Sequence, residues 1–229
     1  MSNDLKLNPT NPFSPSELIL LNGDQFAQKV MLGNVQLMHS EASVSVSQLG
    51  EAILAAAVLA VESVGNLQLD VRSEKAMFGL RKVKSLFVKP TFQPNYWPDY
   101  CLEAQLIQIG ERLDREEESA KFSDLIYIWL RQDSSSPWQS TIEMVQSGLA
   151  ERGLLEKSET TKLKVFTTIN YSLPETTVAL AEEYSVDPVR ELLKNCENNR
   201  KEIWDLIKKE NKKAIKQRTE QSDMDMDFD

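Results

Sequence analysis

The chain has 229 residues, 41% of them hydrophobic, which is enough for one large domain or two small ones with a real core. Its formal net charge of −9 disfavours a general nucleic-acid binder, which would normally carry a basic surface. The only two cysteines lie far apart without metal-ligand spacing, and the first twelve residues lack the apolar stretch of a signal peptide. We therefore expect a cytoplasmic protein with free thiols.

The N-terminal part predicts an unstructured arm followed by a short helix. Residues 1–14 hold two prolines, three asparagines and few large apolar side chains. Ser14 is a candidate N-cap, Pro15 suits the first helical position, and Glu17 stands at the spacing of a capping box. A helix is therefore expected over residues 15–21.

Residues 46–71 contain the longest apolar run of the chain, and the rest of the fold is expected to form around them. The apolar residues surround a helical wheel almost completely, which indicates a buried central helix. Glu51 and Glu62 bracket only about ten apolar residues, which predicts a helix too short to span a membrane. Gly65 ends the helix, and residues 67–71 alternate as a half-buried strand does.

The remaining apolar spacing predicts mostly helices. They are expected over residues 100–113, 122–130, 137–152, 174–184 and 188–196.

Two segments repeat the order helix, glycine, hairpin. In the first, a polar and turn-rich connection over residues 72–79 leads to a returning strand over residues 83–88. In the second, Gly153 precedes a strand start, a turn is expected over residues 157–161, and residues 162–171 alternate as a strand. The expected fold class is therefore mainly α with small β-hairpins (α+β), with winged-helix-like helix–hairpin units.

The expected organisation has three parts. The disordered arm of residues 1–14 precedes a single helical domain over residues 15–198, and residues 199–229 form a charged C-terminal extension. That extension begins as a basic helix, with eight basic and three acidic residues over residues 199–218, and ends in an acidic tail expected to be disordered.

Two basic clusters are the candidate binding residues for lipid or phosphate. One lies in the first hairpin and the other in the C-terminal helix, and the residues are Arg72, Arg81, Lys82, Lys84, Lys208, Lys209, Lys212 and Lys213. A basic helix with Trp204 can lie on an anionic membrane. The alternatives are an ordinary solvated hairpin and a terminal helix docked on the core.

No residues are expected to be catalytic, and neither a metal nor a cofactor is expected. His39 is the only histidine and has no ligand or nucleophile partners at suitable spacing. The glycines form neither a phosphate loop nor a dinucleotide fingerprint. The prediction is therefore a protein that is not an enzyme.

Four stretches together resemble the Golgi phosphoprotein 3 family. LGEAILAAAVLAVESVGNLQL (Leu49–Leu69) resembles that family's buried helix and strand, and GLAERGLLEKSETTKLKVFTTINYSL (Gly148–Leu173) resembles its later helix and hairpin. SELILL (Ser16–Leu21) matches the opening helix, and DLIYIWLRQDSSSPW (Asp124–Trp138) fits the helix between. The resemblance implies a mainly helical fold with a projecting hairpin.

The resemblance also implies a peripheral membrane protein that recognises phosphatidylinositol 4-phosphate and protein tails, and that self-associates through the hairpin at Leu154–Ile169. The family's eukaryotic lipid pocket uses a tryptophan and several arginines. At the matching positions this chain has Ser45, Leu54, Gln139 and Ile142, so that pocket is not carried over.

The expected function is a non-catalytic adaptor, peripheral on a membrane or bound to a partner protein, that binds anionic lipid of the phosphoinositide type. The alternative is a winged-helix-like module that binds nucleic acid or a regulatory complex. Its recognition helix, residues 137–152, offers only Arg152, Gln139 and Gln146 for base contacts, so nucleic acid is not the expected partner.

Overall fold

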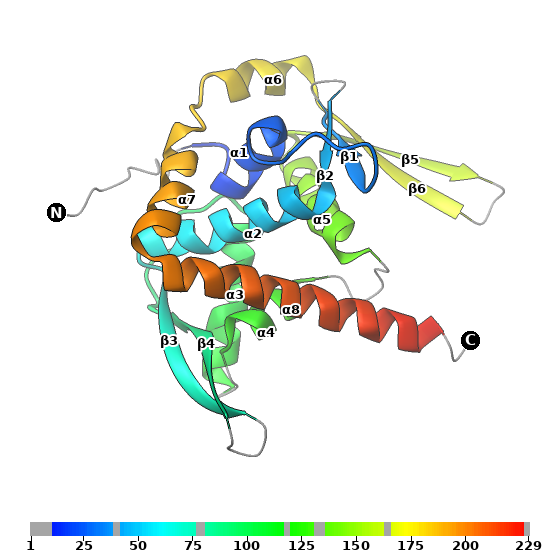
Figure 1. Ribbon diagram of the computed structural model, residues 1–229. Coiled ribbons are helices and arrows are strands. Elements are labelled where there is room, and N and C mark those ends of the chain that lie inside the picture. The colour runs from blue at the N-terminus through cyan, green and yellow to red at the C-terminus, as the bar shows by residue number, and fades with distance from the viewer. Residues whose placement is uncertain are drawn as a thin grey trace.

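The computed structural model describes residues 11–38, 42–76, 81–116, 120–130, 136–162 and 166–226, and Figure 1 shows their arrangement. Within these ranges the chain is mainly helical, with eight α-helices (57%) and three two-stranded antiparallel hairpins, so the α+β class is confirmed. The order is α1 (Pro15–Leu21), η1 (Gly23–Gln25), β1 (Asn34–Gln36), β2 (Ser43–Ser45), α2 (Val46–Ser63), β3 (Leu67–Ala76), β4 (Arg81–Pro90), α3 (Leu102–Arg115), α4 (Phe122–Trp129), α5 (Pro137–Glu151), β5 (Glu156–Lys162), β6 (Phe166–Ser172), α6 (Glu175–Glu182), α7 (Asp187–Asn199) and α8 (Lys201–Met226).

Helix α2 is the centre of the core, as its all-round apolar sequence predicts. Eleven of its residues are buried, and α1, α3, α5, α7 and α8 pack around it. By length and composition α2 is the one helix among the described residues that could cross a membrane, so the expectation that its apolar run is too short is wrong. In the fold, 61% of that stretch is buried inside the protein, which is the burial of a core helix.

The two helix–glycine–hairpin units are confirmed, and their helices end in the same way. Gly65 after α2 and Gly153 after α5 adopt positive φ angles of 82° and 73°. In each case the next residue donates its N–H five residues back, from Asn66 to Val61 at 3.0 Å and from Leu154 to Leu149 at 2.9 Å. This is the Schellman ending, in which a glycine accepts a left-handed conformation that costs other residues energy.

Both hairpins are longer in strand than the sequence predicts. Residues 72–76 belong to β3, so the expected turn-rich connection over residues 72–79 begins too early. The turn expected over residues 157–161 is wrong, because these residues lie in β5 and pair with β6, with Lys157 opposite Tyr171. The described side chains of β5 are exposed, so this strand needs no alternation of polar and apolar residues, and its polar sequence resembles a turn.

The ends of the described chain are more ordered than expected. Phe13 and Ser14 are buried, so the packed part of the chain begins before Pro15, while residues 1–10 lie outside the described ranges. Helix α8 continues through Met226, so the prediction of a disordered acidic tail is wrong for residues 220–226. An ion pair between Lys216 and Glu220 at 3.5 Å, one helical turn apart, supports this last part of the helix.

Candidate functional site

The two basic clusters predicted from the sequence meet in one surface. Helix α8 packs against β4 and α4. Lys84 of β4 forms an ion pair with Glu202 of α8, and Lys209 Nζ donates to the Lys84 backbone carbonyl at 3.1 Å. The hairpin and the helix, which the sequence offers as separate candidates, are therefore joined through Lys84.

The free end of the hairpin concentrates positive charge on one face. Lys75 stands directly opposite Lys82 in the register, and Lys84 follows on the same face. Like charges in directly opposite positions destabilise a sheet. No ion pair joins Lys75 or Lys82 to an acidic residue within the part of the chain that the structure describes, so both charges are open to an external anion.

Arg72 lies on the other face of the hairpin and is not part of this cluster. Its Nε is 2.7 Å from Asp70 Oδ2, and its guanidinium lies 4.6 Å from the centre of the Phe87 ring. Arg81 pairs through its backbone with Ala76 at the end of the strands, and its side chain lies outside the described residues. Of the three predicted hairpin cations whose side chains the structure describes, it therefore brings only Lys82 and Lys84 together.

The four predicted lysines of α8 lie on two flanks of the helix. Lys209 and Lys213 face the hairpin and α4, and Lys213 Nζ is 3.2 Å from Ser123 Oγ. Lys208 and Lys212 face the N-terminal half of the fold. Lys208 Nζ lies 5.8 Å from the centre of the Trp204 ring, and Lys212 Nζ lies 3.8 Å from Glu51. Lys208 and Lys212 are thus separated from the hairpin by the helix itself.

Helix α8 is docked on the core along most of its length. Its buried residues recur every three or four positions, and they are Leu206, Ile207, Glu210, Asn211, Ala214, Ile215 and Arg218. The Arg218 guanidinium lies 3.8 Å from the centre of the Tyr127 ring and donates to the Tyr127 carbonyl. The docked alternative therefore describes α8 better than a free amphipathic helix does. The apolar spacing of the sequence indicates only the first half of this face, because polar residues interrupt the second half.

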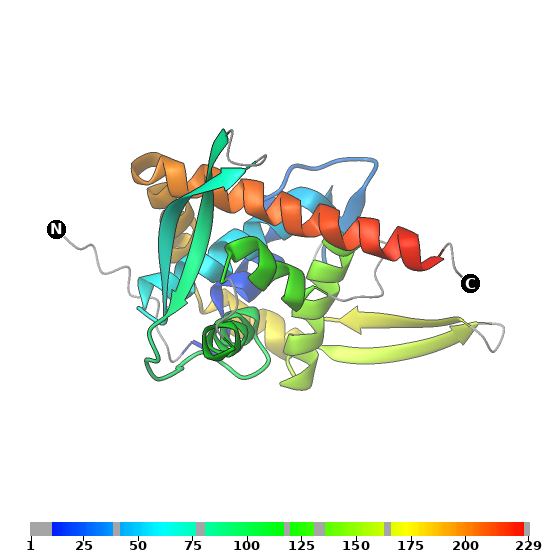
Figure 2. The same ribbon diagram turned by 90° about the horizontal axis from the view of Figure 1, so that it is seen from below.

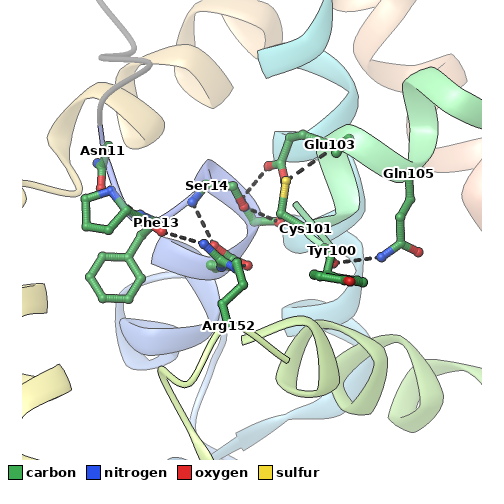
Figure 3. A network of polar contacts seen from close by, with 12 residues as sticks. Asn11, Phe13, Ser14, Tyr100, Cys101, Glu103, Gln105 and Arg152 are labelled. Carbon is green, nitrogen blue, oxygen red and sulfur yellow. Dashed lines mark hydrogen bonds and ion pairs between the residues drawn. The ribbon is translucent and has the colours of Figure 1, made fainter. Parts of the chain in front are cut away.

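A buried polar network ties α1, α3 and α5 together, and no sequence motif announced it as a whole. Figure 3 shows Arg152 beside the N-terminal segment and Glu103 beside Cys101. Glu17 accepts from the Ser14 N–H at 2.8 Å, as the capping box predicts, and forms an ion pair with Arg152. Glu103 accepts from the Ser16 N–H and Oγ, each at 2.8 Å.

Burial governs the protonation of this network. Desolvation raises the pKa of Glu17 to about 7, although Arg152 acts in the opposite direction. Burial, helped by the nearby Glu103 carboxylate, also raises the pKa of the Cys101 thiol. Glu17 and Glu103 are fully buried, so the network is placed to hold helices together and not to meet a substrate.

The second hairpin projects from the body, as Figures 1 and 2 show. Ile169 of β6 is an exposed large apolar residue, and an open groove of about 600 Å³ lies between the hairpin and α5. Self-association through the hairpin at Leu154–Ile169 stays a prediction.

The positions at which the resemblance would place a phosphoinositide pocket hold structural residues. Leu54 and Ile142 are fully buried in the core. Ser45 accepts a capping hydrogen bond from the Gln48 N–H at 3.4 Å, and Gln139 donates to Glu143 at 3.1 Å. None of the four side chains can supply the positive charge that a phosphoinositide head group requires.

The chain was compared with protein-family models, curated proteins and solved structures, and none of them matches it. Among the described residues no three His, Cys, Asp or Glu side chains are grouped so that they could hold a metal ion. His39 lies outside the described residues.

Proposed function

We propose that this protein is a non-catalytic, cytoplasmic adaptor that attaches peripherally to an anionic membrane, with a fold of the Golgi phosphoprotein 3 type. The observation that carries the proposal is the basic surface formed by Lys75, Lys82 and Lys84 of the hairpin and Lys209 of α8. Figure 2 shows the paired ends of β3 and β4 rising on the side of the molecule that carries α8, so a flat anionic surface could reach both.

The composition of α8 supports an electrostatic attachment. Over residues 201–218 the six lysines of α8 are balanced by only two acidic residues outside the buried face, Glu202 and Asp205, and the last part of the helix adds Glu220, Asp223 and Asp225. The lysines are Lys201, Lys208, Lys209, Lys212, Lys213 and Lys216. Each lysine near an anionic leaflet contributes about 1 kcal/mol, and the effect fades within a Debye length. The chain as a whole is acidic, so this attraction depends on the local surface and not on net charge.

The order of elements supports the family resemblance, while the chemistry of its lipid pocket does not transfer. The chain is mainly helical, and its β5–β6 hairpin projects from the body, which is the arrangement that the resemblance implies. The anion would instead meet lysines, which bind phosphate and carboxylate as flexible point charges with little head-group selectivity. We therefore propose recognition of anionic lipid in general, with a protein tail or a second copy of this chain as the further partner of an adaptor.

Three intramolecular contacts disfavour the nucleic-acid alternative. Arg152, Gln139 and Gln146 of the candidate recognition helix engage Glu17, Glu143 and Met38 respectively. A helix that reads bases needs such side chains free to enter the major groove.

Vesicle flotation tests the proposal. The intact protein should float at low salt with phosphatidylcholine vesicles that contain 20% phosphatidylserine, about tenfold better than with pure phosphatidylcholine, and lose this preference at high salt. The double variant Lys82→Glu/Lys209→Glu should lose it at any salt. The control Arg115→Glu/Lys157→Glu changes net charge equally on α3 and β5 and should behave as the wild type.

Equal recovery with neutral and anionic vesicles would overturn the proposal. Retention on duplex DNA that is stronger than on anionic vesicles, and that falls steeply with salt, would favour the nucleic-acid alternative instead.

A further inference from the structure

Two apolar side chains stand fully in solvent at the segment that joins η1 to β1. Met31 is 94% exposed and Leu32 is 89% exposed, more than any other large apolar residue among those that the structure describes. Single exposed apolar residues are common, but two adjacent ones at the end of a loop are a costly arrangement in water. We call Met31 and Leu32 the apolar tip.

The backbone around the apolar tip is held in a defined turn. Gly33 has a φ of 63°, a left-handed conformation, and its carbonyl accepts from the Val46 N–H at 3.1 Å. The Asn34 side-chain amide lies 3.3 Å from the Val30 carbonyl and 3.2 Å from the Met31 carbonyl. Three of the backbone acceptors are therefore already engaged, which lowers the cost of moving this turn out of water.

The apolar tip lies on the basic side of the molecule. In Figure 2 the blue segment that joins η1 to β1 rises on the same side as α8 and the paired ends of β3 and β4. An open groove of about 360 Å³ is lined by Phe26, at the start of this segment, by Trp204 and Lys208 of α8, and by residues of α2 and α7. Lys29, two residues before the tip, is exposed as well.

Apolar side chains beside lysines and a tryptophan match the layers of an anionic membrane surface. Lysines meet the charged head groups, tryptophan prefers the interface, and aliphatic side chains prefer the acyl boundary. We propose that Met31 and Leu32 insert into an anionic bilayer and act as its apolar anchor, while α8 and the first hairpin supply the charge. The inference rests on the proposed function for the orientation of the molecule, but the insertion is a separate event.

A fluorescent label at the tip tests insertion directly. The intact Leu32→Cys variant is labelled with an environment-sensitive dye, which Cys101 and Cys196 should not take up because both are buried. Vesicles with 20% phosphatidylserine should shift the emission to the blue. A label at Tyr96→Cys should not respond, because Tyr96 is 67% exposed in the segment between β4 and α3, which Figure 2 shows on the opposite side from α8.

A matched pair of double variants measures the contribution of the tip. Met31→Ser/Leu32→Ser should weaken flotation with the same vesicles by roughly tenfold or more, because it removes two aliphatic side chains that insertion would bury in the bilayer. Phe92→Ser/Tyr96→Ser removes two large side chains, 59% and 67% exposed, from the other side and should leave flotation unchanged. Circular dichroism should show both variants folded, since neither pair lies in the core.

The outcomes separate this inference from the proposed function. If the wild type floats only with anionic vesicles while the label at residue 32 stays silent and the serine variant binds normally, the anchor is wrong and the charged surface stands. If the label shifts equally with pure phosphatidylcholine vesicles, the anchor stands and charge-driven recognition is wrong. If no vesicle shifts the label, the anchor is wrong.

Discussion

The two helix–glycine–hairpin units have the same local structure, but the first hairpin is packed more extensively against other elements of the fold. The first hairpin, β3–β4, has a buried base that includes Leu67, Leu86 and Val88, with α8 and α4 packed against β4. The second hairpin, β5–β6, projects from the body and exposes Ile169. The chain order of helix, glycine and two strands therefore decides which elements form, while a distant segment decides which hairpin becomes part of the core.

The helices of the two units are also anchored differently at their ends. Helix α5 is followed by Arg152, which forms a buried ion pair with Glu17 of α1, with side-chain exposures of 14% and 0%. Helix α2 carries Glu62 near its end, which pairs with Arg200 before α8, with exposures of 16% and 38%. One unit is held by a charge pair in the interior and the other by a pair that water reaches.

The largest effect should come from breaking the buried ion pair between Arg152 and Glu17. Arg152→Met leaves a buried carboxylate without its partner and removes the 2.6 Å hydrogen bond to the Pro12 carbonyl. Removing one partner of a buried pair costs about 3–5 kcal/mol. Urea unfolding at pH 8 should show this loss, and a stability equal to that of the wild type would mean that Glu17 does not depend on the arginine.

A smaller effect should distinguish the two hairpins. Leu86→Ala removes a fully buried side chain from β4 and should lower the free energy of unfolding by about 2–5 kcal/mol. Ile169→Ala, at 42% exposure in β6, should cost about 1 kcal/mol or less. Urea unfolding of both variants measures the difference. Equal losses would show that β5–β6 is covered in solution, as self-association through that hairpin would require.

The network around Glu17 should make stability depend on pH. The pKa of Glu17 rises from 4.5 to about 7 on folding, so between these values the unfolded chain ionises while the folded one keeps the proton. The free energy of unfolding should therefore fall as the pH rises through this window, by about 1.4 kcal/mol per unit and about 3 kcal/mol in all. Above pH 7 this contribution is lost.

Glu17→Gln supplies the control for that pH dependence, because it keeps a hydrogen-bond acceptor but cannot ionise. Its stability relative to the wild type should rise by about 3 kcal/mol between pH 4.5 and pH 8, measured by urea unfolding. All other groups titrate in both proteins and cancel in the difference. A difference that stays constant with pH would show that Glu17 is ionised in the folded protein throughout.

Local sequence patterns carry much of this architecture, and contacts between distant residues carry the rest. The capping box at Ser14 and Glu17 and the endings at Gly65 and Gly153 are local, so the sequence predicts them. The partner of Glu17 is Arg152, which lies 135 residues away just after α5, and nothing in the spacing of either residue indicates the pair. Such a pair can be found only once the helices are placed.

The basic surface of the first hairpin and α8 also depends partly on local sequence patterns and partly on contacts between distant residues. The basic residues of the hairpin and of α8 are visible as charge runs, but their meeting through Lys84 depends on how α8 docks. The sequence indicates that docking only for the start of α8, because Glu210, Asn211 and Arg218 interrupt its apolar face further along. The apolar tip was missed for a related reason: Met31 and Leu32 resemble core residues by type, and only the fold shows them exposed.

The smallest effect should come from breaking the partly exposed ion pair between Arg200 and Glu62 at the end of α2. The Arg200 guanidinium lies 2.6 Å and 2.5 Å from the two Glu62 oxygens, a two-pronged contact, but solvent and salt screen it. Arg200→Met should therefore cost about 1 kcal/mol or less. The free energy of unfolding, measured with urea at low and high sodium chloride, should show the wild-type advantage shrinking with salt. A salt-independent loss as large as that of Arg152→Met would mean that both units are anchored by interior charge pairs, and that the covering of the hairpins alone distinguishes them.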